Sequence, residues 1–179
     1  CASSYNAIRP ELLNYQSNQS TQEVDFFYRY DVLNERGNKK YAKKESRSGV
    51  KVVAVKIVNN SKKAFTFGED LKVHRNGTPV NLMTPDLVIS SLKQGVPIYL
   101  LYLLLTPMRL ITPQDDYPIG LLVGPGITVG NMAVASTANK RLEREMADNF
   151  LNGKVVQPGE TVYGIIGIAD QGYSPLELK

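Results

Sequence analysis

The chain has 179 residues, of which 42% are hydrophobic and 21% are charged, with ten Tyr and five Phe. These values are typical of a globular protein and exclude disorder, and the length is enough to bury a core without disulfides or a structural metal. A single cysteine excludes an intrachain disulfide. With one cysteine and one histidine a zinc site is excluded, and no H-E-x-x-H, G-x-S-x-G or P-loop pattern occurs.

The net charge of +4 is unevenly distributed. Residues 35–63 contain ten Lys or Arg and two Glu, which leaves the rest of the chain at about −4. A basic cluster lies among turn residues and indicates a solvated hairpin tip or, alternatively, a contact for polyanions such as anionic lipid head groups or glycans. The cluster consists of Lys39, Lys40, Lys43, Lys44 and Arg47. Nucleic acid is not expected as a partner, because aromatic residues do not alternate with the basic ones.

Cys1 is the only cysteine and is followed by Ala2, Ser3 and Ser4. This pattern is typical of mature bacterial lipoproteins, and it predicts lipid attachment at Cys1 and a location in the bacterial cell envelope, outside the cytoplasm. The alternative is a residue added by cloning. Residues 1–23 are rich in Ser, Asn and Gln and are expected to form a polar tether, with a single domain over residues 24–179.

Strand patterns begin at Val24. Residues 24–33 are rich in aromatic and β-branched side chains and are followed by turn residues 34–38, which predicts a hairpin with a basic return strand. Residues 50–58 alternate Val with Ala, Lys and Ile and give the strongest strand signal in the chain. We expect this segment to be a core strand.

Further strands follow at short intervals. Residues 64–67 begin the next strand, and residues 71–75 pair with residues 79–82 through Asn76-Gly77, a dipeptide that tolerates the positive φ angles of a tight hairpin. Pro158-Gly159-Glu160 is a turn before a buried strand at residues 161–168. Short strands at this spacing predict an antiparallel sandwich.

The middle of the chain departs from this pattern. Residues 96–105 and 119–135 are two apolar tracts, and neither predicts a membrane-spanning helix, because Pro107 and Arg109 end the first while Pro125 and several glycines interrupt the second. Membrane spanning is therefore not expected. A helix is predicted from residue 136 or 137 to Leu151, with Pro125 as an alternative start, because apolar residues recur every four positions. We therefore expect a helical, apolar insertion at about residues 85–153.

The second tract contains Gly120-x-x-x-Gly124 and Gly126-x-x-x-Gly130, a spacing that lets two backbones approach closely. Packing against the protein's own sheet is favoured over dimerisation in a membrane. The alternative is that residues 96–135 stay partly exposed and contact a protein partner, an apolar ligand or a lipid surface.

Candidate catalytic residues are scarce. His74 lies within a predicted strand beside a turn and has no predicted partner for catalysis. Asp115 and Asp116 are adjacent in a solvated loop and lack the alternating spacing of a calcium-binding loop. We therefore expect no catalytic residue, no cofactor and no metal, and the chain is not predicted to be an enzyme.

Two segments resemble parts of a known group of proteins. Residues 50–61, V-K-V-V-A-V-K-I-V-N-N-S, and residues 156–168, V-Q-P-G-E-T-V-Y-G-I-I-G-I, are similar to the strand edges of small secreted or lipid-anchored bacterial proteins with immunoglobulin-like β-sandwiches. This resemblance implies a mainly β, antiparallel immunoglobulin-like sandwich carrying the helical insertion, and it supplies no catalytic residues.

The expected function is that of a non-enzymatic cell-envelope lipoprotein, a binding or assembly module. The alternative is an exported carrier that binds a lipid or another apolar ligand between the central apolar segments and the sheet. An enzyme is a third hypothesis, which would need a cleft that joins His74 to carboxylates.

Overall fold

The computed structural model describes residues 1–111 and 116–179, apart from the side chains of Leu110 and Leu122. The fold is mixed, with 36% helix, 28% strand and antiparallel sheets. The chain divides into two compact units. Unit 1 comprises Cys1–Tyr5 and Gln94–Arg141, and unit 2 comprises Asn6–Lys93 and Leu142–Lys179.

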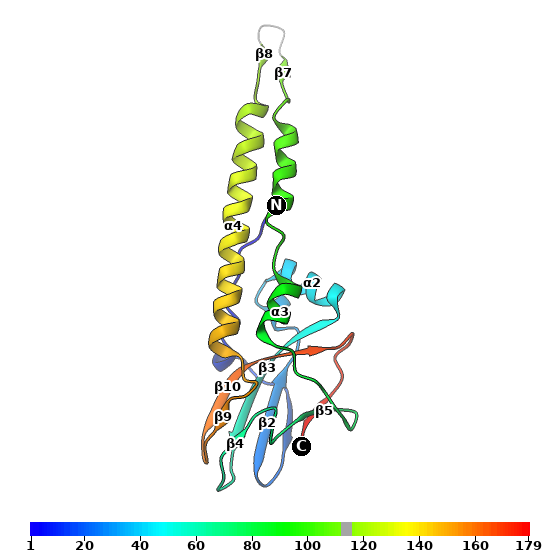
Figure 1. Ribbon diagram of the computed structural model, residues 1–179, viewed down its shortest axis with the longest axis vertical. Coiled ribbons are helices and arrows are strands. Elements are labelled where there is room, and N and C mark those ends of the chain that lie inside the picture. Colours follow the sequence, from blue (N-terminus) through cyan, green and yellow to red (C-terminus); the bar gives the residue numbers. More distant parts are fainter. Residues whose placement is uncertain (112–115) are drawn as a thin grey trace. The chain divides into compact units, whose positions relative to one another are not determined.

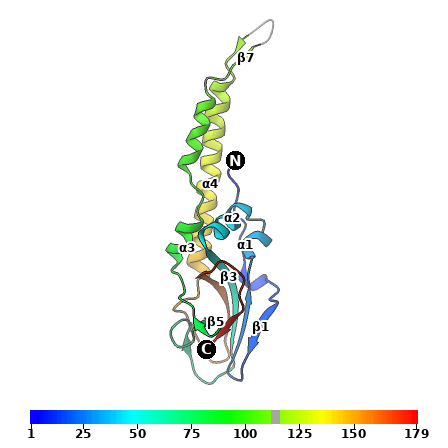
Figure 2. The ribbon, with the colours of Figure 1, turned by 90° about the vertical axis from the view of Figure 1, so that its right-hand side faces the viewer.

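Unit 2 is built on a four-stranded antiparallel sheet (Figures 1 and 2). Its order is β1 (Ser17–Ser20), β2 (Val24–Arg29), β3 (Val50–Asn59) and β10 (Thr161–Ala169). Strands β3 and β10 pair from Val50 opposite Ala169 to Val58 opposite Thr161. The first six residues of β3 are all buried, because both faces of this strand are covered. The strands predicted at residues 50–58 and 161–168 are confirmed.

One face of this sheet packs on a layer of short strands, with Phe26, Ile57, Phe67 and Ile166 fully buried between them. The layer contains β4 (Phe65–Thr66) paired with β9 (Val155–Val156), and a three-stranded sheet of β11 (Leu176–Leu178), β5 (Val73–Arg75) and β6 (Thr78–Pro79). Asn76 and Gly77 have φ angles of 50° and 78°, which confirms the predicted β5–β6 hairpin.

Helices cover the other face of the sheet. They are α1 (Val32–Glu35), α2 (Lys39–Ser48) and α3 (Pro85–Leu92), and all three contact β3. Leu33, Tyr41, Val88 and Leu92 are fully buried beneath them. Helix α3 begins where the sequence chemistry favours it, because Thr84 Oγ1 accepts a hydrogen bond from the Leu87 amide and Pro85 occupies the first turn.

The predicted hairpin between residues 24–33 and a basic return strand is wrong. Strand β2 pairs with β1 and β3, and the basic segment is helix α2. The physical reason is that residues 39–48 lack β-branched side chains, while Tyr41 and Glu45 are four residues apart and form a buried helical face. Gly49, with a φ angle of 66°, ends the helix.

The expectation of a mainly β protein is also wrong, because helix exceeds strand. The antiparallel strands and the helical insertion are confirmed. Among the described residues, the layer that faces the four-stranded sheet consists of separate sheets of three and two strands, not of one complete second sheet.

Residues 1–23, the expected tether, are built into both units. Tyr5 and Ile8 are buried, Pro10–Leu12 form a 3₁₀ turn, and Ser17–Ser20 are the edge strand β1. The expected single domain over residues 24–179 corresponds to all of unit 2 from Val24 onward together with most of unit 1.

Unit 1 contains two antiparallel legs that lie side by side in Figures 1 and 2. The first leg is the 3₁₀ helix η2 (Pro97–Leu105), and the second is α4 (Gly120–Asn149), whose residues from Leu142 onward belong to unit 2. The short strands β7 (Leu110–Ile111) and β8 (Asp116–Tyr117) join them. The helix predicted from residue 136 or 137 to Leu151 is present but is longer at its start: it begins at Gly120, five residues before the alternative start at Pro125, and ends at Asn149.

Candidate functional site, an apolar helical hairpin

The two apolar tracts predicted from the sequence come together in unit 1. We call residues 96–135 the apolar hairpin. Gly120 and Gly124 of α4 face the first leg: a Cβ at Gly120 would lie 2.3 Å from the carbonyl oxygens of Leu105 and Thr106, and one at Gly124 would lie 2.8 Å from Thr106 Oγ1. The first G-x-x-x-G pair therefore packs the two legs against each other. A Cβ atom placed at Gly126 or at Gly130 would have no other atom within 4 Å.

The outer surface of the hairpin is apolar. Twelve of the sixteen large hydrophobic side chains described as exposed lie between Ile98 and Val134. Leu104 and Ile111 are 76% and 77% exposed, which is close to the exposure of a free side chain. The other members are Ile98, Leu100, Leu101, Leu103, Met108, Tyr117, Leu121, Val123, Val129 and Val134. An exposed apolar surface of this extent goes beyond the singly scattered apolar residues that are normal on a soluble monomer.

Charges are almost absent from this segment. Between Lys93 and Lys140 the sequence contains three charged residues, Arg109, Asp115 and Asp116. Arg109 Nε lies 3.1 Å from Asp116 Oδ1, so β7 and β8 place an ion pair at the end of the hairpin that joins the legs. Both side chains are more than 40% exposed. Asp115 lies outside the described residues.

Two polar side chains of α4 within the hairpin bond to the backbone of their own helix. Thr128 Oγ1 donates to the Gly124 carbonyl at 2.9 Å, and Asn131 Nδ2 donates to the Ile127 carbonyl at 2.8 Å. These bonds satisfy polar groups without water, as is common for Ser, Thr and Asn in apolar surroundings.

A polar clasp fixes residues 1–5 to the base of the hairpin. The Gln94 side chain pairs with both backbone groups of Ser3: Nε2 donates to the Ser3 carbonyl at 2.7 Å, and Oε1 accepts from the Ser3 amide at 3.2 Å. The Asn139 side chain does the same for the Gln94 backbone, at 2.8 and 2.9 Å. Gln94 and Asn139 are buried. Because buried amides cost free energy when unpaired, these bonds specify one position for the N-terminal segment.

Cys1 lies beside the hairpin. Its amino group donates to Tyr102 Oη at 3.4 Å, and its side chain is exposed. The next amide, of Ala2, donates to Asn131 Oδ1 on the other leg. Tyr102 stacks on Tyr99, with ring centroids 6.4 Å apart and planes 9° from parallel. The structure thus brings the predicted lipid attachment residue next to the hydroxyl of Tyr102.

One helical segment of the described residues, Pro85–Leu105, is long and apolar enough to cross a membrane by length and composition. It comprises α3, a break and η2. Core helices of soluble proteins meet the same criterion but are mostly buried, whereas 22% of the most apolar window of this segment is buried.

The basic cluster lies on helix α2 in unit 2, not on a hairpin tip. Lys39, Lys43 and Arg47 are exposed and follow one another at four-residue spacing, so they form a basic stripe along one helix face. Lys40 and Lys44 are half-buried, and Lys44 Nζ donates to the Lys93 carbonyl at 2.6 Å. Three of the five residues of the predicted polyanion contact thus share an exposed face, and the contact itself stays a prediction.

Opposite this stripe, α2 buries Glu45. Its Oε1 accepts a hydrogen bond from the Val52 amide at 2.7 Å. Burial raises the pKa of Glu45 to about 7, and the Val52 hydrogen bond and the nearby Lys51 oppose this shift only in part. This carboxyl links α2 to the central strand β3.

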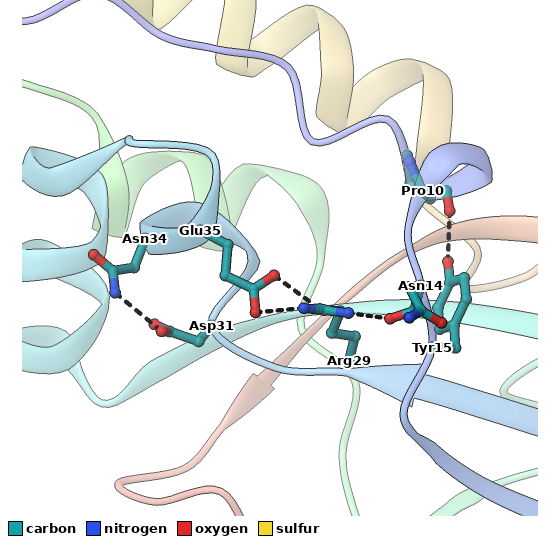
Figure 3. Close-up of polar contacts among 7 residues, drawn as sticks. All are labelled: Pro10, Asn14, Tyr15, Arg29, Asp31, Asn34 and Glu35. Carbon is teal, nitrogen blue, oxygen red and sulfur yellow. Dashed lines mark hydrogen bonds and ion pairs between the residues drawn. The ribbon is translucent and has the colours of Figure 1, made fainter.

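A second polar cluster of unit 2 lies at the end of β2 (Figure 3). Arg29 makes a two-pronged ion pair with Glu35, with both nitrogen to oxygen distances at 2.8 Å, and its Nη1 donates to the Asn14 carbonyl. Beside it, Tyr15 Oη donates to the Pro10 carbonyl at 2.8 Å. Every charged group drawn in this cluster has a partner, so the cluster fastens the N-terminal segment to the sheet.

Sites for other chemistry are not apparent in the described residues. No group of three or more His, Cys, Asp or Glu in that part of the chain could hold a metal ion. His74 lies on β5, and its Nδ1 is 3.0 Å from the Lys72 carbonyl. Three shallow cavities of 590, 290 and 500 Å³ lie in unit 2, and none of the three is lined by residues 96–135.

Sequence reasoning found the members of the hairpin but not their arrangement. The clasp residues Gln94 and Asn139 are 45 positions apart and had no visible relation. The sequence does contain one signal for this arrangement. Charged residues are nearly absent from the whole stretch between Gln94 and Asn139, which contains both apolar tracts.

Comparisons with known proteins add no relative. No protein-family model, no curated protein and no solved structure matches the chain.

Proposed function

We propose that the chain is a non-enzymatic membrane protein of the cell envelope, in which the apolar hairpin is embedded in a lipid bilayer and unit 2 is a binding or assembly module in water. The observation that carries this proposal is the exposed apolar surface of the hairpin. Burying one large apolar side chain gains about 1.5–3 kcal/mol, so twelve partly exposed ones represent on the order of 10 kcal/mol. A hydrocarbon phase recovers this free energy.

The backbone of the hairpin suits hydrocarbon. Helices satisfy their own amides and carbonyls, which is the main requirement for a segment inside a bilayer. At the turn, the Gly120 amide donates to the Met108 carbonyl at 2.8 Å, and the Met108 amide donates to Leu105 at 3.0 Å. Pro125 and the glycines, which argued against a spanning helix when the second tract was considered alone, are tolerated when a neighbouring helix packs against them.

Lipid attachment at Cys1 is a separate part of this proposal. Cys1 has an exposed side chain and contacts the Tyr102 hydroxyl through its amino group, and tyrosine is enriched where membranes meet water. An acyl chain at this position would enter the leaflet on the side where the two legs of the hairpin enter the bilayer. The bacterial envelope location and the likeness of unit 2 to an immunoglobulin-like sandwich are further parts that stay predictions.

The basic stripe of α2 is consistent with a membrane partner. Lys39, Lys43 and Arg47 would each contribute up to about 1 kcal/mol near an anionic surface, and this attraction weakens as salt increases. We propose that this stripe adds an electrostatic component to binding, secondary to the apolar hairpin.

The test is flotation of purified, non-acylated Cys1→Ser protein with phospholipid vesicles. A double variant, Leu101→Glu with Leu104→Glu, places two charges on the apolar surface and should lower the vesicle-bound fraction at least tenfold, because a charge inside a bilayer costs a few kcal/mol. The matched control, Leu12→Glu with Leu87→Glu, changes two leucines of unit 2 that are also more than half exposed and should float like the parent.

Circular dichroism establishes that both variants are folded. Failure of the parent to float, or equal flotation of both variants, contradicts the proposal. A parent that stays in solution and copurifies with an apolar ligand would instead support the carrier function.

A further inference from the structure

We propose that the hairpin crosses the entire bilayer, so that the ion pair between Arg109 and Asp116 rests among the head groups of the opposite leaflet. This inference rests on the proposed function and adds that the lipid head groups of the opposite leaflet are the partner of the Arg109–Asp116 ion pair. The alternative within the same function is a re-entrant hairpin, whose tip stops near the bilayer centre.

The entry level is fixed by the N-terminal segment. Residues 1–5 are not helical, and their amides bond to side chains of Gln94 and Asn131. Irregular polar backbone of this kind does not occur next to lipid within the hydrocarbon region. The hydrocarbon therefore begins beyond the level at which Ala2 meets Asn131. The Tyr102 hydroxyl, which contacts the Cys1 amino group, lies at this boundary, whereas the Tyr102 backbone lies further along the hairpin, beside Gly124.

The remaining length matches a bilayer. From Asn131 to Gly120, α4 rises about 17 Å at 1.5 Å per residue. The four residues back to Asp116 extend at most about 13 Å further. The Gly120 amide bonds to the Met108 carbonyl, so Arg109 lies one residue beyond the level of Gly120. The ion pair thus lies roughly 20–30 Å from the entry level, and the hydrocarbon core is about 30 Å thick. The bilayer centre, at about 15 Å, is already passed within α4.

The charges decide between the two arrangements. A re-entrant hairpin would leave Arg109 and Asp116, both more than 40% exposed, surrounded by hydrocarbon. Charges there are costly, whereas paired charges at a head-group layer are not. Tyr117 follows Asp116 directly and is 49% exposed, so tyrosines occur at both ends of the apolar surface, as in aromatic belts of spanning segments.

The experiment is cysteine labelling in sealed vesicles. Three single-cysteine variants in the Cys1→Ser background probe the tip (Tyr117→Cys), the middle (Val129→Cys) and the entry end (Lys140→Cys). The protein carries a C-terminal affinity tag and is reconstituted at about one molecule per vesicle. Capture through the tag selects vesicles with unit 2 outside, since both ends of the hairpin continue into unit 2. A membrane-impermeant maleimide is then added outside, or is trapped inside during reconstitution.

The expected pattern has three parts. Lys140→Cys reacts with the external reagent only, Tyr117→Cys reacts with the trapped reagent only, and Val129→Cys reacts with neither, while all three react after detergent is added. A Tyr117→Cys that reacts with neither reagent, or with the external one while Val129→Cys stays protected, overturns the crossing but leaves an embedded hairpin. External labelling of all three variants overturns the proposed function itself.

Discussion

The two units place the same kinds of side chain in opposite surroundings. In unit 2, Val, Ile and Phe of β2, β3 and β10 are buried between helices and short strands, whereas in unit 1 leucines of η2 are up to 76% exposed. The core strands of unit 2 and the legs of the hairpin are both rich in apolar residues. Composition therefore does not distinguish a buried core from an exposed apolar surface. The difference lies in what covers the side chains, and for the hairpin we propose that lipid is the cover.

The largest contrast should appear when one apolar side chain is removed from each unit. Phe26→Ala empties a fully buried position of unit 2 and should lower the free energy of unfolding by about 3–5 kcal/mol. Leu104→Ala removes an exposed side chain and should change it by less than about 0.5 kcal/mol in water. Urea denaturation followed by circular dichroism measures both, and similar losses would mean that Leu104 is covered within the protein.

A second contrast concerns pH. The pKa of Glu45 is about 7 in the folded state, against an ordinary value of 4.5. Between pH 4.5 and pH 7, the folded state therefore binds more protons than the unfolded chain. The free energy of unfolding should therefore fall as pH rises from about 4.5 to 7, by up to about 3 kcal/mol.

The control for this contrast is Glu45→Gln, which retains an oxygen that can accept the Val52 hydrogen bond. Urea midpoints at pH 5 and pH 8 should differ for the parent and converge for this variant. An unchanged pH dependence in Glu45→Gln would assign the effect to other groups.

The smallest contrast is within the hairpin, between glycines that pack and glycines that do not. Gly120→Ala pushes a methyl group into the carbonyls of Leu105 and Thr106 and should destabilise the pairing of the legs by about 1–3 kcal/mol. Gly126→Ala meets no atom within 4 Å and should stabilise α4 by about 0.5–1 kcal/mol through helix propensity.

Thermal unfolding of the two variants in detergent gives the comparison. If both raise or both lower the transition temperature, Gly120 is not the contact between the legs.

The sequence supported the parts of the fold that depend on local pattern. The β-branched run of β3, the Asn76-Gly77 turn and the four-residue apolar repeat from Ala138 to Phe150 each determine a local structure. Helix α2 was missed because its basic residues and flanking turn residues suggested a strand, although Tyr41 and Glu45 at helical spacing were the better indicator.

The candidate site was less accessible because it depends on pairing at a distance. Gly120 packs against Leu105 and Thr106, and the Asn139 side chain bonds to the backbone of Gln94. Local propensity predicts neither contact. Considering residues 96–105 and 119–135 separately also led to the expectation that neither spans a membrane. Pairing two such segments in one hairpin changes that expectation, because each leg shields the other's glycines and backbone.

The central claim is that lipid covers the hairpin surface, and depth-dependent fluorescence quenching tests it most directly. In the Cys1→Ser background, Val129→Cys on the hairpin and Leu87→Cys in unit 2 each receive the same environment-sensitive fluorophore, at positions that are 67% and 55% exposed. In vesicles, the account predicts that brominated lipid chains quench the probe at residue 129 while aqueous iodide does not, and that the probe at residue 87 shows the reverse. Iodide quenching at residue 129 equal to that at residue 87 would contradict the account.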